Sequence, residues 1–417
     1  MEPSQHALTR EETERCVDEI QPVPLDQYGS DLWFQQHILA ERLNNRAHYS
    51  VQHQVEEFVG DLLAERGKLA VLAANLIRIG AWKAHVWPKL DPAVLQQAHI
   101  KAYFLLFHEA TLMNLLEIVL FHQPHVLALG PVLPDLIDYC ATRVAWLNTA
   151  EATAARAPQE VPPAASPAQL AAPSDPAADL QAHRTQLQFT IAMTSISVLR
   201  YITECGEALP LGAQQRLFGH HDVPAAAIYL IHNAPWIRRR VSTDAKAASP
   251  APGRREATLE RFNEGRWEAL AHDDVPRLGK TEAQVWLLLY NLLLEPAFQT
   301  RYPFTAFRVR HVMSLSDVFT ATLRDQLPVI ERLERYVAQV AILHATRSEQ
   351  AGAGEEAAEN AARAMAQVVE LSDLAVQIDS ADWNAHRGRR RRHARTERRR
   401  RRQQQRSIPA GAARPLV

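Results

Sequence analysis

The chain has 417 residues, of which 47% are hydrophobic and 22% are charged, and its formal net charge is −1. Such a composition is typical of a globular protein and excludes a chain that is disordered throughout. The length suffices for two domains of ordinary size. Only 15 glycines are present, too few for a protein built from many tight hairpins. We therefore expect an all-α fold.

Amphipathic segments with a helical period predict a first helical region over residues 1–150. Ser30 is placed to cap the first helix, and prolines or glycines end the later ones. The expected helices cover about residues 30–43, 55–67, 69–87, 93–121 and 134–146.

Residues 151–179 differ in composition from the helical region before them, because Ala, Pro, Gln and Ser dominate and six prolines fall between positions 158 and 176. Such a stretch buries little apolar area, so it predicts a flexible linker or a surface insertion. A second helical region, residues 180–345, follows it. Its expected helices cover about residues 180–202, 224–232, 282–294, 313–323 and 328–343, with an irregular stretch at 242–253.

Helices of this length joined by short connections are typical of armadillo- or HEAT-like solenoids. The sequence has no strict period, so an irregular helical bundle is the alternative. An Ala- and Glu-rich helix is expected within residues 346–386. The tail, residues 387–417, carries 13 arginines and one acidic residue, Glu397, which predicts a disordered basic end.

The basic tail allows a second interpretation of function, a helical-repeat scaffold that binds nucleic acid or is directed to the nucleus. The tail contains no aromatic residue on which bases could stack. Binding of nucleic acid is therefore the less favoured alternative.

Motifs for catalysis, cofactors and metals are missing from the sequence: it has no phosphate-binding loop, dinucleotide-binding turn or nucleophile elbow. His108-Glu109 begins like a zincin signature, but the position of the second histidine is Leu112. Pro124 separates His122 from His125, so these two are expected to be surface histidines. We expect neither an enzyme nor a metal or cofactor site.

Tryptophans are the main candidates for contacts with partners. Trp236 and Trp267 lie near expected helix ends or loops, where a large aromatic ring can be a partly exposed anchor. With the adjacent Arg238 and Arg239 they form the set of predicted partner-binding residues. Other tryptophans follow apolar stripes and are expected in the core; these are Trp33, Trp82, Trp87, Trp146 and Trp286.

Cys16, Cys140 and Cys205 are the three cysteines, and so sparse a set argues for a reducing compartment. The first 20 residues lack the apolar core of a signal peptide. The apolar run at 285–294 is about half as long as a membrane span. A cytoplasmic location without a membrane is the expectation.

Short segments in order along residues 25–345 resemble the zinc finger MYND domain-containing protein 10 family. They are residues 29–33 (GSDLW), 35–37 (QQH), 108–110 (HEA), 114–117 (NLLE), 136–140 (LIDYC), 197–205 (SVLRYITEC), 235–236 (PW) with Arg238 and Arg239, 284–286 (QVW), 289–294 (LYNLLL) and 325–328 (DQLP).

The resemblance implies a non-enzymatic assembly factor for axonemal dynein arms, needed for motile cilia and flagella. It implies as partners axonemal dynein heavy and intermediate chains, a leucine-rich-repeat assembly factor, and the Hsp90 system with a prolyl-isomerase co-chaperone. It implies a location in the cytoplasm, including the apical cytoplasm, centriolar satellites or dynein assembly foci.

One departure from the family concerns its C-terminal MYND finger, in which clustered cysteines and histidines bind two zinc ions. This sequence has no cysteine after Cys205, so the zinc ions of the finger have no ligands here. Two explanations are open: a divergent or shortened form, or a C-terminal sequence read from a wrong exon or frame.

Overall fold

The computed structural model describes residues 8–90, 99–157, 176–241, 257–299 and 301–350. All of these belong to one compact unit, Met1–Ala362. Several predicted segments lie outside the described residues. They are residues 158–175 of the linker, the irregular stretch at 242–253, the helix at 346–386 beyond residue 350, and the tail at 387–417.

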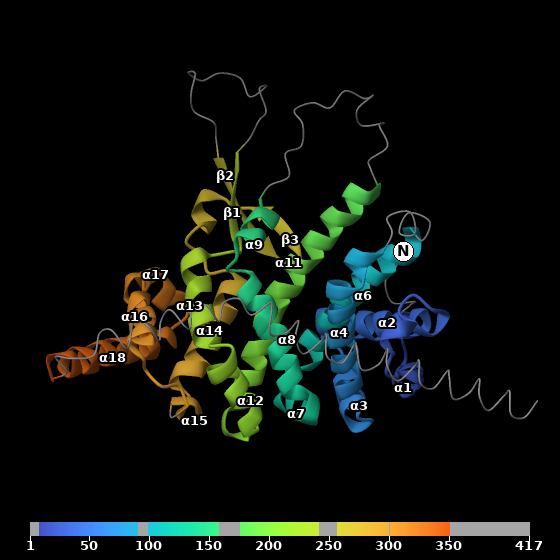
Figure 1. Ribbon diagram of the computed structural model, residues 1–417, viewed down its shortest axis with the longest axis horizontal. Helices are drawn as coiled ribbons and strands as arrows, with labels where there is room; N and C mark the ends of the chain where they lie inside the picture. Colours follow the sequence, from blue (N-terminus) through green and yellow to red (C-terminus); the bar gives the residue numbers. More distant parts are fainter. Residues whose placement is uncertain (1–7, 91–98, 158–175, 242–256, 300, 351–417) are drawn as a thin grey trace, which may run out of the picture. The chain divides into compact units, whose positions relative to one another are not determined.

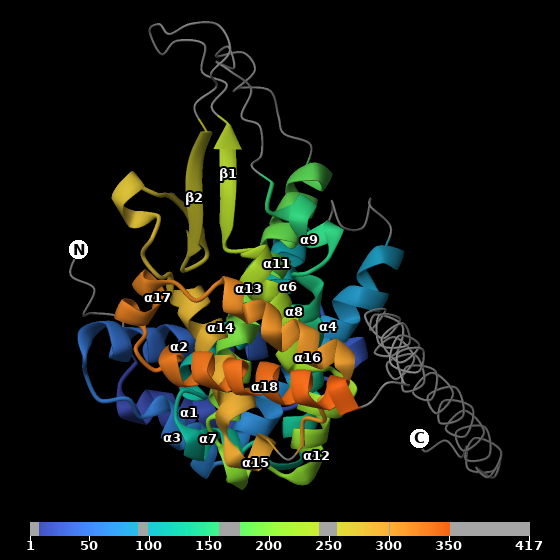
Figure 2. The same ribbon diagram turned by 90° about the vertical axis from the view of Figure 1, so that its left-hand side faces the viewer.

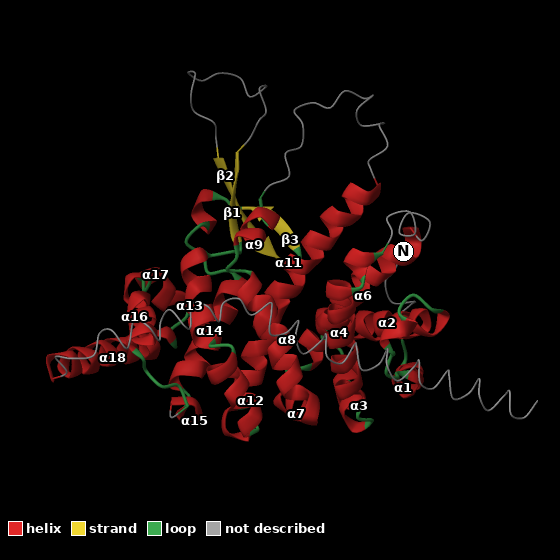
Figure 3. Cartoon of the chain, in the orientation of Figure 1, coloured by secondary structure: helices red, strands yellow, loops and turns green. Residues whose placement is uncertain are grey.

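Helices make up most of the described residues, which confirms the all-α expectation (Figure 3). Ser30 caps α2 as predicted, because its hydroxyl oxygen accepts the backbone N–H of Trp33. The helices of the first region are α1 (Arg10–Glu19), α2 (Asp31–His53), α3 (Val59–Glu65), α4 (Lys68–His85), α6 (His99–Val119), α7 (Gln123–Leu127), α8 (Leu133–Trp146) and α9 (Ala150–Ala155).

The second region begins with the long helix α11, and both ends of the predicted linker are helical, in α9 and α11. The predicted helix at 313–323 is wrong, because a 3-10 turn, Leu315–Asp317, separates α16 from α17. The helices are α11 (Pro176–Thr203), α12 (Leu211–Gln215), a π-helix (Arg216–His220), α13 (Val223–Asn233), α14 (Lys280–Leu294), α15 (Pro296–Gln299), α16 (Ala306–Ser314), α17 (Ala321–Gln326) and α18 (Ile330–Gln350).

Helix α11 connects the two predicted regions, since it contacts α6 and α8 of the first and α14 of the second (Figure 1). Helices α16 and α18 pack side by side further along the chain (Figure 2). One continuous cluster of buried apolar side chains extends from Cys16 to Val340. Within the described residues, the stretch Ile100–Val119 is long and apolar enough to cross a membrane, but 61% of it is buried in this core. Helix α6 is thus a central core helix.

A small antiparallel sheet of β1 (Ile237–Val241), β2 (Ala257–Asn263) and β3 (Arg266–Ala269) was not expected from the sequence. Strands β2 and β3 join at Glu264 and Gly265, whose φ angles of 46° and 83° suit a tight hairpin. The sheet packs on α11 through Phe262, whose ring centroid lies 5.1 Å from that of Phe189.

All three cysteines are free and buried. Cys16 lies on α1 and Cys140 on α8, whereas Cys205 follows the end of α11. Burial raises the pKa of the Cys140 thiol to about 12 and that of Cys205 to about 11. The thiols therefore behave as small apolar core groups.

Candidate docking groove

Two adjoining cavities lie along α6. The first, of about 490 Å³, opens between α2, α3, the end of α6 and α7, and the second, of about 620 Å³, opens between α2, α6, α11, the β2–β3 turn and α14. They share Glu57, Ile118 and His122, and we call them together the α6 groove. Other residues that line it are Val51, Val55, Gly60, Asp61, Glu117, Phe121, His125, Met193, Tyr201, Glu264 and Lys280.

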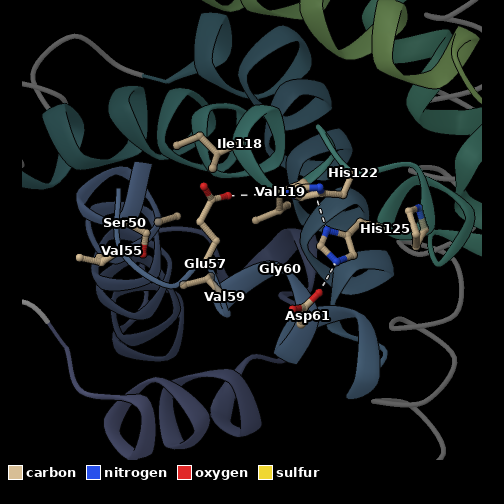
Figure 4. Close-up of a pocket in the computed structure, with 12 residues that line it drawn as sticks. Ser50, Val55, Glu57, Val59, Gly60, Asp61, Ile118, Val119, His122 and His125 are labelled. Atoms are coloured by element: carbon tan, nitrogen blue, oxygen red, sulfur yellow. Dashed lines mark hydrogen bonds and ion pairs between the residues drawn. The ribbon is translucent and has the colours of Figure 1, made fainter. Parts of the chain in front are cut away.

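The inner wall of the first cavity is formed by His125. Its Nδ1 lies 2.7 Å from the carbonyl oxygen of Val119, and its Nε2 lies 2.9 Å from a carboxylate oxygen of Asp61 (Figure 4). Because both ring nitrogens face oxygen acceptors, the orientation of the ring is fixed. The expectation of a surface histidine is confirmed for the exposed His122 and is wrong for His125, which is 6% exposed.

Gly60 on α3 allows His125 to take this position. A Cβ atom at Gly60 would lie 2.5 Å from Cε1 and 2.8 Å from Nδ1 of the ring, far closer than non-bonded atoms approach. A glycine is therefore required here for the ring to reach both of its acceptors.

At the mouth of the first cavity, Glu57 and His122 point toward each other, with 3.6 Å between a carboxylate oxygen and Nε2 (Figure 4). Both side chains are about half exposed. A pair this accessible to water contributes little to stability, so both groups are available to a ligand.

Apolar side chains reach solvent around the groove. Val51, Val55 and Phe121 are 48%, 41% and 55% exposed. The ring of Phe121 lies edge-on to that of Tyr201, with 5.6 Å between centroids. Exposed apolar side chains gathered around one concavity are typical of an interaction site.

The charges around the groove are mainly negative. Its lining has four carboxylates, Glu57, Asp61, Glu117 and Glu264, and one lysine, Lys280, 3.8 Å from Glu264. Burial raises the pKa of Glu117, and a hydrogen bond from Ser197 opposes that shift. The groove is thus suited to a polypeptide segment with apolar and basic side chains.

The predicted partner-binding residues lie elsewhere, on and beside the sheet. Trp236 is 2% exposed, so the expectation that it is partly exposed is wrong: its ring packs in the core. Trp267 is half-buried against Phe189, and the guanidinium of Arg238 lies 4.3 Å from its ring centroid. Arg239 is exposed.

Arg238 and Trp267 are therefore the two of these residues that the fold brings together, and Nε of Arg238 also lies 2.6 Å from a carboxylate oxygen of Glu260. The residues of the groove were missed. The one local signal in the sequence that could have indicated the groove is Phe121, a large aromatic residue just after the apolar helix α6.

A buried histidine pair lies between α2 and α6, with His37 Nδ1 3.1 Å from His108 Nδ1. Burial lowers the pKa of His37 to about 4, and burial together with His37 lowers that of His108 to about 3. His108 thus faces another imidazole, while the carboxylate of Glu109 pairs with Lys83. This arrangement fits the structural role expected for His108 and Glu109.

Asp138, His220 and His221 form a second polar cluster, with candidate ligand atoms within 4.8 Å of one another. One carboxylate oxygen of Asp138 lies 2.7 Å from Nε2 of His221, and the other lies 3.1 Å from Nη1 of Arg216. A guanidinium on the same carboxylate repels a metal cation, so we assign no metal to this cluster.

No family model and no solved structure matches the chain. The "Zinc finger MYND domain-containing protein 10 homolog" of Drosophila melanogaster is 27% identical over 335 residues, which cover 80% of this chain and 68% of that protein. This match confirms that the chain resembles the zinc finger MYND domain-containing protein 10 family over most of its length.

Proposed function

We propose that this protein is a non-enzymatic cytoplasmic assembly factor for axonemal dynein arms, needed for motile cilia and flagella. The observation that supports the proposal is the match to a zinc finger MYND domain-containing protein 10 homolog over 80% of the chain. The partners of this protein would be dynein heavy and intermediate chains, a leucine-rich-repeat assembly factor, and the Hsp90 system with a prolyl-isomerase co-chaperone.

The α6 groove supplies a surface for such work. An adaptor holds a segment of a client or co-chaperone without changing it chemically, so it needs apolar area and matching charge. The groove combines the exposed Val51, Val55 and Phe121 with carboxylates around them. We propose that it docks a polypeptide segment that carries apolar and basic side chains.

The test is the substitution Phe121→Glu, with Leu211→Glu as its matched control. Both side chains are exposed, at 55% and 59%, so neither change opens a hole in the core, and Leu211 lies outside the lining of the groove. In ciliated cells that lack the protein, the control should restore dynein arms. Phe121→Glu should fail to restore them and should recover less dynein chain and chaperone on co-precipitation.

The charge argument has its own variant, Glu57→Lys, which reverses a half-exposed carboxylate at the junction of the two cavities. We expect weaker partner recovery with unchanged thermal unfolding. Intact dynein arms in cells without the protein would contradict the proposed function. A nuclear location with bound nucleic acid would favour the scaffold with a basic tail instead.

A further inference from the structure

A third cavity lies where α4, α8, α9 and α11 meet. It has a volume of about 160 Å³, and its lining includes Lys83, Glu109, Arg143, Arg184 and Gln188. One water molecule occupies about 30 Å³ of liquid, so the space admits roughly five waters or one small oxyanion. Its walls are strongly polar, which sets it apart from an apolar packing defect.

The charges in the wall do not balance. Lys83 Nζ lies 2.7 Å from one carboxylate oxygen of Glu109, and Arg143 Nη2 lies 2.9 Å from the other. The hydroxyl of Tyr139 also donates to that second oxygen, at 2.6 Å. Two cations therefore share one carboxylate, and the side chains of Lys83 and Glu109 are only 9% and 4% exposed.

Close packing of the helices holds this arrangement together. A Cβ atom at Gly80 on α4 would lie 2.8 Å from the ring of Tyr139 and 3.0 Å from Arg143 Nη2. Lys83 Nζ additionally donates to the carbonyl oxygen of Leu106, at 3.2 Å. The cationic groups are thus fixed in place.

Arg184 adds further positive charge from α11. The pKa of Lys83 is lowered mainly by burial and further by the charges of Arg143 and Arg184, whereas Glu109 opposes the shift. In the described part of the chain, no hydrogen-bond acceptor is found for the guanidinium of Arg184 or the side-chain amide of Gln188. Glu151 also lines the cavity but is exposed to water, where screening weakens its effect.

Lys83 is buried, and Arg143 and Arg184 are partly buried; an excess of positive charge in such surroundings is costly unless an anion compensates it. Guanidinium and ammonium groups with free donors around an oxyanion-sized space are the usual means of binding carboxylate or phosphate. We propose that this cavity binds a small oxyanion of phosphate or carboxylate chemistry, held by Lys83, Arg143, Arg184 and Gln188. This site is separate from the α6 groove and does not depend on the proposed function.

The experiment measures thermal unfolding of the full chain against inorganic phosphate or acetate, at constant ionic strength set with chloride. We expect the melting temperature to rise and to saturate with anion concentration, as it does for a ligand that binds only the folded state. A stronger response to phosphate would identify a phosphate as the preferred ligand, and a stronger response to acetate would identify a carboxylate.

Arg184→Gln should abolish the saturable rise, and it removes no hydrogen bond that the described residues make. Arg239→Gln, the same change at an exposed arginine of β1, should keep it. Lys83→Met removes one of the proposed anion ligands and lowers the excess positive charge, while Glu109 retains Arg143 and Tyr139, so the rise in its melting temperature with either anion should be weaker than in wild type. The proposal is overturned if wild type shows no rise, or if Arg184→Gln rises as much as wild type does.

Discussion

Replacing Gly60 with alanine tests whether a glycine is required at this position to make room for the ring of His125. A glycine in a helix is normally about 1 kcal/mol less favourable than alanine, so the change should stabilise α3 if space were free. Here the new methyl group would lie 2.5 Å from the ring of His125. The ring must move, and overpacking of this kind costs about 1–3 kcal/mol.

Displacement of the ring also removes the partner of the Val119 carbonyl. An unpaired buried polar group costs about 1–3 kcal/mol. With the helix gain of about 1 kcal/mol subtracted, a net loss of about 3 kcal/mol in the free energy of unfolding is expected for Gly60→Ala. Urea unfolding, followed by circular dichroism, measures it directly.

Gly212→Ala is the matched control, because no atom lies within 4 Å of a Cβ built there. It should leave stability unchanged or raise it slightly. In a His125→Ala background the ring is gone, so Gly60→Ala should no longer destabilise the protein. If Gly60→Ala costs as much in that background as in wild type, the steric explanation is refuted.

Other predictions concern the core. Trp286→Ala removes a ring that is 2% exposed and should cost about 3–5 kcal/mol in urea unfolding. Arg308→Met leaves Asp222, 2.7 Å from Arg308 Nε, without its buried partner, and the same assay should show a loss of about 3–5 kcal/mol. In the folded protein the pKa values of His37 and His108 are lowered to about 4 and 3, whereas an unfolded histidine has a pKa of about 6.5. Below about pH 6.5 the unfolded state therefore binds more protons than the folded state does. Their contribution to stability is therefore complete above about pH 6.5 and is lost as the pH falls toward 4; the double substitution His37→Phe with His108→Leu should flatten that part of the stability profile.

The helices were predictable where a strong apolar stripe and a local stop signal coincide. The expected helix at 282–294 is α14, Lys280–Leu294, and the Ser30 cap begins α2. The sheet was missed because β1 reads Ile-Arg-Arg-Arg-Val, which lacks the alternation of apolar and polar residues that marks a strand. Two of its arginines, Arg238 and Arg240, pair with Glu260 on the neighbouring strand, where Glu260 lies opposite Arg238. This pairing depends on the tertiary structure and cannot be read from the local sequence.

The groove depends even more on tertiary structure. His125 looks like a surface residue beside Pro124, yet its acceptor Asp61 lies 64 positions earlier in the sequence. The expected partial exposure of Trp236 was wrong for a similar reason, because its ring enters a core completed by helices from distant parts of the chain. Local patterns determine the helices, whereas the positions of charged and aromatic groups around a cavity follow from how the helices meet.

The three buried thiols can report local unfolding of the protein, because a buried thiol reacts only when its segment opens to solvent. The thiolate is the nucleophile that attacks an alkylating reagent. Because Cys140 is buried and its pKa is about 12, modification requires that the surrounding helix first separates from its neighbours. Cys16 on α1, Cys140 on α8 and Cys205 beyond α11 sample separate segments. Their relative labelling rates would therefore rank the local stabilities of these segments without any engineered probe.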